Sequence, residues 1–127
     1  MASSPTSRTL ELLRDTGWVA DVVERWVPKT RVRRDLYGVI DVLAFHVEHS
    51  RILGVQATSG PNGAARTTKI LKEPRARGWL RAGGELEVWA WRRYVQPDAS
   101  PGSTGALWRP RVTTITLDSD WSLPGMI

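Results

Sequence analysis

The chain has 127 residues, with eighteen lysines and arginines against thirteen acidic residues, so its net charge is +5. This length suits one domain with a single core, spanning residues 1–127. The absence of cysteine excludes disulfides and thiolate zinc sites. No apolar run approaches the roughly 20 residues that cross a bilayer, so we expect a cytoplasmic protein with no membrane partner. The excess of cations favours a polyanionic partner, and nucleic acid above all.

The first predicted element is a helix that follows a short polar stretch. We expect residues 1–6 to form a flexible leader, because they contain no apolar core. Thr6 or Ser7 can cap a helix that runs to about Asp15, and Gly17 is a typical residue to end it.

Three strands are predicted next. Residues 18–27 are rich in β-branched and aromatic side chains, which predicts a first strand, and residues 30–34 form a basic connector. Residues 37–47 and 51–58 predict two further strands, and the short segment 48–50 between them suits a hairpin.

The C-terminal half predicts a helical crossover and two more strands. Residues 64–72 and 75–82 are expected to be helical, and residues 85–91 alternate apolar and polar side chains as a strand does. Residues 96–106 are rich in Pro, Ser and Gly and predict a flexible loop before a last strand at 111–117. The fold class is therefore α/β, bordering on α+β, with a mixed sheet flanked by helices.

One carboxylate stands out in this pattern. Residues 39–45 are almost entirely apolar, and Asp41 lies in the middle of them. Burying a carboxylate there is costly unless it is paired or holds a metal. The following strand ends in a polar cluster that contains Gln56 and Thr58, where a paired first strand can present Asp41.

These residues resemble the metal site of the PD-(D/E)XK nuclease superfamily, and in particular its Holliday junction resolvase-like and small phage-borne members. The resemblance covers about residues 10–94 and includes the αβββαβ order of the restriction-endonuclease-like core, here with an extra C-terminal strand. Asp41 takes the position of the family's Asp, Gln56 that of its second acidic residue, and Thr58 that of its Lys. The resemblance implies a metal-dependent DNA endonuclease that hydrolyses phosphodiester bonds with Mg²⁺ or Mn²⁺ as its cofactor.

 It also implies DNA, branched DNA included, as the partner. We expect a homodimer, because a small enzyme that cuts both strands usually needs two sites.

Two departures from the family pattern bear on the chemistry. Gln56 offers an amide oxygen to a cation but brings no negative charge, and Thr58 cannot replace an ammonium group. Arg66 and Lys69 lie three positions apart on the next helix and share a face, so either can bring a cation to the site. A missing carboxylate can come from Glu11, if the first helix packs across the site, or from Asp35.

The resemblance therefore gives two sets of site residues. The catalytic set is Asp41, Gln56, Thr58, Lys69 and Glu11. The metal ligands are the side chains of Asp41 and Gln56 and the carbonyl of Ala57, because Mg²⁺ and Mn²⁺ prefer oxygen ligands.

Basic residues cluster on either side of the Asp41 strand. Clusters of this kind contact phosphates, which gives salt-dependent affinity without sequence readout. The DNA-binding residues that we expect are Arg31, Arg33, Arg34, Arg66, Lys69 and Lys72.

Several alternatives stay open from the sequence. The fold can bind DNA without cutting it, or Asp41 can have a purely structural role in which it accepts backbone hydrogen bonds. A third alternative is an interaction module that docks a partner through a tryptophan-rich face. Trp89 and Trp91 share one face of a strand, and we expect them in the core rather than stacked on bases.

Overall fold

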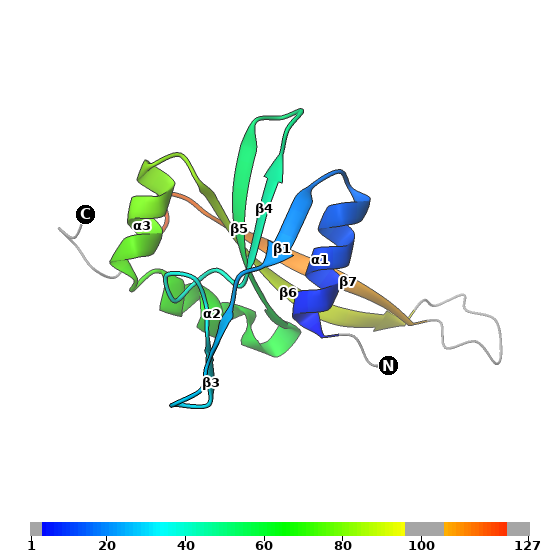
Figure 1. The fold of residues 1–127 in the computed structure, drawn as a ribbon. Helices are drawn as coiled ribbons and strands as arrows, with labels where there is room; N and C mark the ends of the chain where they lie inside the picture. Colours follow the sequence, from blue (N-terminus) through cyan, green and yellow to red (C-terminus); the bar gives the residue numbers. More distant parts are fainter. Residues whose placement is uncertain (1–3, 96–105, 122–127) are drawn as a thin grey trace.

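A five-stranded mixed sheet forms the centre of the protein in the computed structural model, which describes residues 4–95 and 106–121 (Figure 1). The strand order is β1-β4-β5-β6-β7, and every neighbouring pair is antiparallel except β5 and β6, which are parallel. The strands are β1 (Val19–Val22), β4 (Val42–His46), β5 (Arg51–Ser59), β6 (Glu85–Val95) and β7 (Ala106–Ile115).

Three helices flank this sheet. Helix α1 (Pro5–Asp15) precedes β1, and the crossover from β5 to β6 contains the short 3-10 turn η1 (Gly60–Asn62), α2 (Gly63–Ile70) and α3 (Pro74–Arg81). The predicted class, a mixed sheet flanked by helices, is confirmed. None of the described helices is long and apolar enough to cross a membrane.

The two faces of the sheet carry separate apolar clusters, because successive side chains of a strand point to opposite sides. Helix α1 covers the face that contains Val42, Val55, Trp89 and Trp91. The indole Nε1 of Trp91 donates to the hydroxyl of the buried Thr9 at 2.8 Å, which confirms the prediction that this tryptophan lies in the core.

The crossover helices contribute to the second cluster, on the other face. Ile70 of α2 and Ala76 of α3 pack there with Leu86 and Val88 of β6 and with Ile40. Alternate side chains of β6 therefore belong to different clusters, with Trp89 and Trp91 in the first and Leu86 and Val88 in the second.

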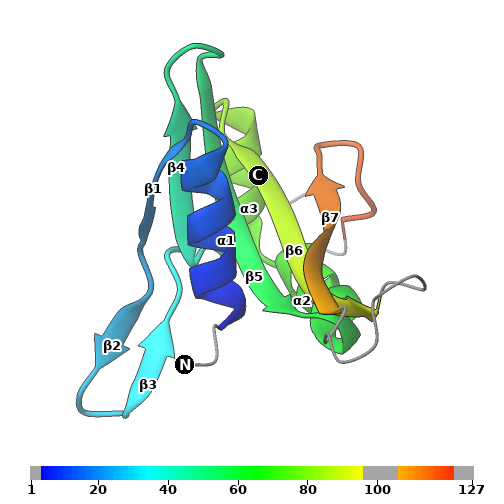
Figure 2. The same ribbon diagram turned by 90° about the vertical axis from the view of Figure 1, so that its right-hand side faces the viewer.

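The region predicted as one strand over 18–27 is instead two strands in different sheets. After β1 the chain leaves the main sheet, and β2 (Arg25–Val27) pairs antiparallel with β3 (Val32–Arg34). Figures 1 and 2 show this two-stranded ribbon, hereafter the arm, extending away from the main sheet. The prediction of a basic connector at 30–34 was wrong for 32–34, because the hairpin turn gives these residues a strand partner.

A tight turn shortens the strand predicted over 37–47. Tyr37 and Gly38 have positive φ angles of 56° and 74°, so the chain reverses there and Leu36 pairs with Ile40. Two backbone hydrogen bonds of 2.8 and 3.0 Å join that pair. Asp41 consequently lies immediately before β4 rather than in the middle of a strand.

The ends of the other elements differ in detail from the predictions. Ser4 caps α1 in a capping box with Ser7, so residues 4–6, which we expected in a leader, belong to the start of this helix. Strand β7 begins at Ala106 rather than at 111, and residues 96–105 of the predicted loop lie outside the described residues.

The turn at 36–40 is fixed to the sheet by a close contact between Ile40 and Gly54. A Cβ atom at Gly54 would lie 2.6 Å from Cδ1 and 2.7 Å from Cγ1 of Ile40, which is fully buried. We expect Gly54→Ala to lower the free energy of unfolding by about 1–3 kcal/mol in denaturant titrations. In an Ile40→Ala background the same substitution should cost less, and equal costs in both backgrounds would contradict this packing.

Candidate active site

The Asp41 carboxylate is buried and hydrogen-bonded to the neighbouring strand. Asp41 is only 4% exposed to solvent. The Ala57 N–H lies 3.1 Å from both carboxylate oxygens, and Nε2 of Gln56 donates to Oδ2 at 3.0 Å. Gln56 and Ala57 are consecutive in β5, so one strand supplies both donors.

The turn at 36–40 brings a second carboxylate to the same place. Leu36 and Ile40 are paired across this turn. Asp35 precedes Leu36 and Asp41 follows Ile40, so the two carboxylates lie close together at the open end of the turn. Like charges in this arrangement repel each other. The Gln56 Nε2 also donates to Oδ2 of Asp35 at 3.1 Å, so a single amide group joins the two carboxylates.

The environment of Asp41 changes its acidity. Burial raises the pKa of Asp41 from 3.8 to about 7, because the charged form loses its hydration. The Ala57 N–H opposes this change, the negative charge of Asp35 adds to it, and the Gln56 amide opposes it. The carboxylate therefore titrates near neutral pH, as is common for functional acids.

These residues line a cleft of about 980 Å³. Helix α2 contributes cationic side chains to its wall, and the base of the arm contributes others. Within the described residues, Arg34, Arg66, Lys69 and Lys72 form no salt bridge. The lining residues that the sequence predicted are Asp41, Gln56, Ala57, Arg33, Arg34, Arg66, Lys69 and Lys72.

Three predicted site residues do not line the cleft. Glu11 is exposed on α1 and does not line the cleft, although Thr6 at the start of the same helix does, so the condition under which Glu11 would supply a carboxylate is not met. Thr58 is buried beside its register partner Ala90, close to the start of α2. Arg31 is exposed in the turn of the arm.

From the sequence, Asp35 was only an alternative source of a carboxylate, because its place beside Asp41 depends on the turn. A glycine at the centre of the apolar segment Leu36–Ile40 was the available signal, because glycine readily adopts the positive φ angle that such a turn requires. The nearly continuous run of apolar residues at 39–45 concealed it by suggesting an uninterrupted strand.

The side chains of this cleft fit a hard divalent cation. The Oε1 atom of Gln56 is buried without a hydrogen-bond partner in the described structure, and the carboxylates of Asp35 and Asp41 lie on the same amide group. No three acidic or histidine side chains cluster suitably for a metal in residues 4–95 and 106–121. Magnesium nevertheless binds with one or two carboxylates when water completes its shell.

Comparisons with protein-family models, with curated proteins and with solved structures found no match.

The raised pKa of Asp41 predicts a pH-dependent stability in metal-free buffer. The native state binds a proton that the unfolded state releases between pH 3.8 and about 7, so Asp41 makes the protein less stable as the pH rises through that interval. We expect Asp41→Asn to gain stability relative to the wild type over the same interval, by up to roughly 4 kcal/mol. Chemical denaturation at several pH values with a chelator measures this difference.

The matched control is Asp15→Asn, which changes an exposed carboxylate at the end of α1. Its stability difference from the wild type should vary much less between pH 4 and pH 8. A difference for Asp41→Asn that stays constant over this range would contradict the desolvation of Asp41.

Proposed function

We propose that the protein is a metal-dependent nuclease that cleaves DNA in the cleft. The observation that carries the proposal is the pair of carboxylates, Asp35 and Asp41, joined through Gln56 in a cleft that cationic side chains of α2 also line. Acidic side chains that can hold a cation and basic side chains that can hold phosphate are both needed for phosphodiester hydrolysis. The order α1-β1-β4-β5-α2-β6 in the main sheet also supports the resemblance to PD-(D/E)XK nucleases.

In this proposal Asp35 replaces the charge that Gln56 lacks. Asp35 and Asp41 would hold Mg²⁺ or Mn²⁺ with their carboxylate oxygens. The Gln56 amide, whose nitrogen faces both carboxylates, would have to turn over to offer Oε1 as a third oxygen. The bound ion supplies Lewis-acid activation of the phosphate and lowers the pKa of a water molecule.

The cations of α2 take the phosphate-binding role in the absence of a lysine at Thr58. Arg66 and Lys69 line the cleft one helical turn apart and contact the non-bridging oxygens of the scissile phosphate. Hydrolysis forms one bond from the water oxygen to phosphorus and breaks one bond to the leaving oxygen, and the proton that the water loses is replaced on the leaving oxygen from solvent. Charge develops on the phosphoryl oxygens in that step, where these two side chains stabilise it.

Metal binding can be measured without any substrate. We expect Mn²⁺ at pH 8 to raise the Tm of the wild type by several degrees, because a ligand of the native state stabilises it. Asp35→Asn and Asp41→Asn should each abolish most of that increase, whereas Glu11→Gln should keep it. Equal increases in all four proteins would count against a metal site at the acidic pair.

Cleavage is the direct test of the proposed activity. Labelled linear, flap and four-way-junction DNA should be cut in Mg²⁺ or Mn²⁺, and Asp35→Asn and Asp41→Asn should slow cutting by roughly 100-fold or more. Glu11→Gln is the matched control, because Glu11 is an exposed carboxylate outside the cleft, and it should cut at the wild-type rate. Cleavage that survives Asp41→Asn would overturn the proposal.

The second candidate is a protein that binds DNA in the same cleft without cutting it. Its support is that Asp41 already has hydrogen-bond donors from Ala57 and Gln56 and that β5 carries Thr58 in place of a lysine. Salt-sensitive binding that Asp41→Asn leaves unchanged, with no cleavage in either metal, would establish this candidate instead.

A further inference from the structure

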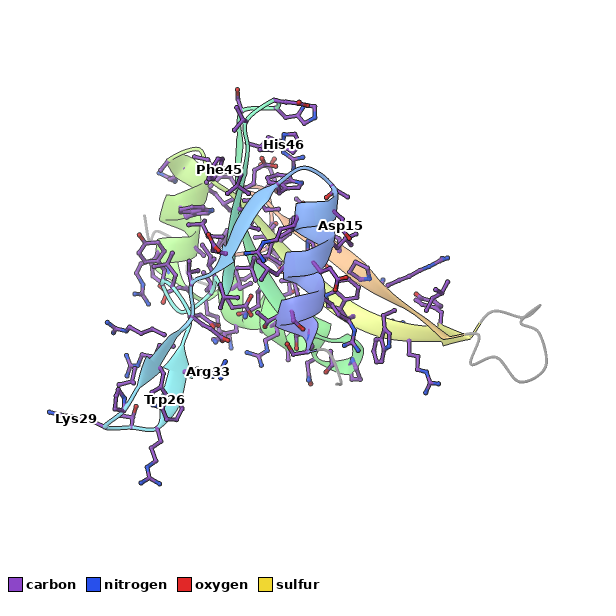
Figure 3. The ribbon with its side chains drawn as sticks, turned by 45° about the vertical axis from the view of Figure 1, so that its right-hand side comes forward. Asp15, Trp26, Lys29, Arg33, Phe45 and His46 are labelled. Atoms are coloured by element: carbon purple, nitrogen blue, oxygen red, sulfur yellow. The ribbon has the colours of Figure 1, made fainter. Side chains whose placement is uncertain are left out.

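The arm formed by β2 and β3 pairs with no further strand among residues 4–95 and 106–121, and it presents side chains to solvent. Trp26 is 53% exposed and Val32 is 52% exposed. Figure 3 shows Trp26, Lys29 and Arg33 on this arm, which points away from the rest of the protein. The side chains of Trp26 and Val32 are therefore available for contact with a partner.

The charge of the arm identifies the chemistry of that partner. Arg25 and Arg34 lie directly opposite each other in the ribbon, and both are exposed. Like charges in a cross-strand pair destabilise a hairpin, and a polyanion removes this repulsion. Arg33 alone among these arginines forms a salt bridge within the described residues, with Glu24 at 3.0 Å.

The position of the arm connects it with the candidate active site. Arg25, Arg33 and Arg34 at its base also line the cleft that contains Asp41. Trp26 pairs with Arg33 in the ribbon, so the two side chains share one face of it, and a nucleic acid held in the cleft by Arg33 would come within reach of the indole.

The indole of Trp26 distinguishes between forms of nucleic acid. Within the described part of the chain, no aromatic ring or guanidinium group stacks on Trp26. Bases inside a duplex already stack on one another, whereas an unpaired base has a free face for an aromatic side chain. The ribbon of the arm is also narrow enough to follow a duplex groove.

We propose that the arm binds DNA where a duplex meets unpaired nucleotides, with Trp26 stacked on an unpaired base and Arg25 and Arg34 on phosphates of the duplex. This inference rests on the proposed function, because it takes DNA as the ligand of the cleft, and it names the substrate class as branched, gapped or tailed DNA.

Binding in a chelator, without cleavage, tests the inference. Fluorescence anisotropy would compare a fully paired duplex with the same duplex carrying a single-stranded tail. We expect Trp26→Ala to weaken binding of the tailed DNA roughly tenfold or more, with a change of less than about twofold for the paired duplex. Trp26→Phe should retain most of the affinity, which separates stacking from a general loss of the arm.

Two further variants complete the experiment. Trp108→Ala removes a tryptophan of β7 that is 45% exposed, and it should leave both affinities unchanged. The double variant Arg25→Ala with Arg34→Ala should reduce the slope of log affinity against log salt concentration by about 1 to 2 on the paired duplex.

The outcomes separate this inference from the proposed function. If Trp26→Ala weakens both forms of DNA equally, or neither, the role of Trp26 is overturned while DNA binding and cleavage stand. If the wild type binds no form of DNA in a salt-dependent manner, the proposed function fails and the inference fails with it.

Discussion

The Asp41 carboxylate lies in an apolar environment, and the arrangement around it depends on the cost of placing a charge there. Two donors from β5, the Ala57 N–H and the Gln56 amide, offset part of that cost. They can do so only because β4 and β5 are paired in a register that places Val42 opposite Val55. The register of one strand pair therefore determines both the protonation of the acid and its position in the cleft.

The Gln56 side chain has a double role in this arrangement. Its nitrogen donates a hydrogen bond to each of the two carboxylates, which offsets their mutual repulsion. Its oxygen is buried without a hydrogen-bond partner in the described structure. An acidic residue at this position would add a third negative charge to the pair. Because the Gln56 amide is neutral, the negative charge of Asp35 can lie next to Asp41. The second carboxylate of the site therefore comes from the turn at 36–40 and not from β5.

The sequence predicted the main elements because their hydrophobic patterns are local. The alternation of Leu86, Val88 and Ala90 identified β6, and the charge pattern placed Arg66 and Lys69 near Asp41, where the cleft contains them. It did not predict the arm, because the pairing of Trp26 with Arg33 depends on a chain reversal that apolar periodicity does not encode. Glu11 was misplaced because a helix pattern does not specify how the helix packs on the sheet.

The contact between Ile40 and Gly54 has a consequence for the motions of the cleft. The amides of Ile40 and Asp41 donate to Leu36 and Val55, and Ile40 itself is fully buried, so opening this turn requires opening the second core cluster. Asp35 and Asp41 therefore keep their positions as long as the protein stays folded. The arm, whose two strands pair with no other strand among the described residues, can open locally. When a ligand contacts both the arm and the acidic pair, the protein loses conformational entropy as the arm becomes ordered and almost none at the two carboxylates.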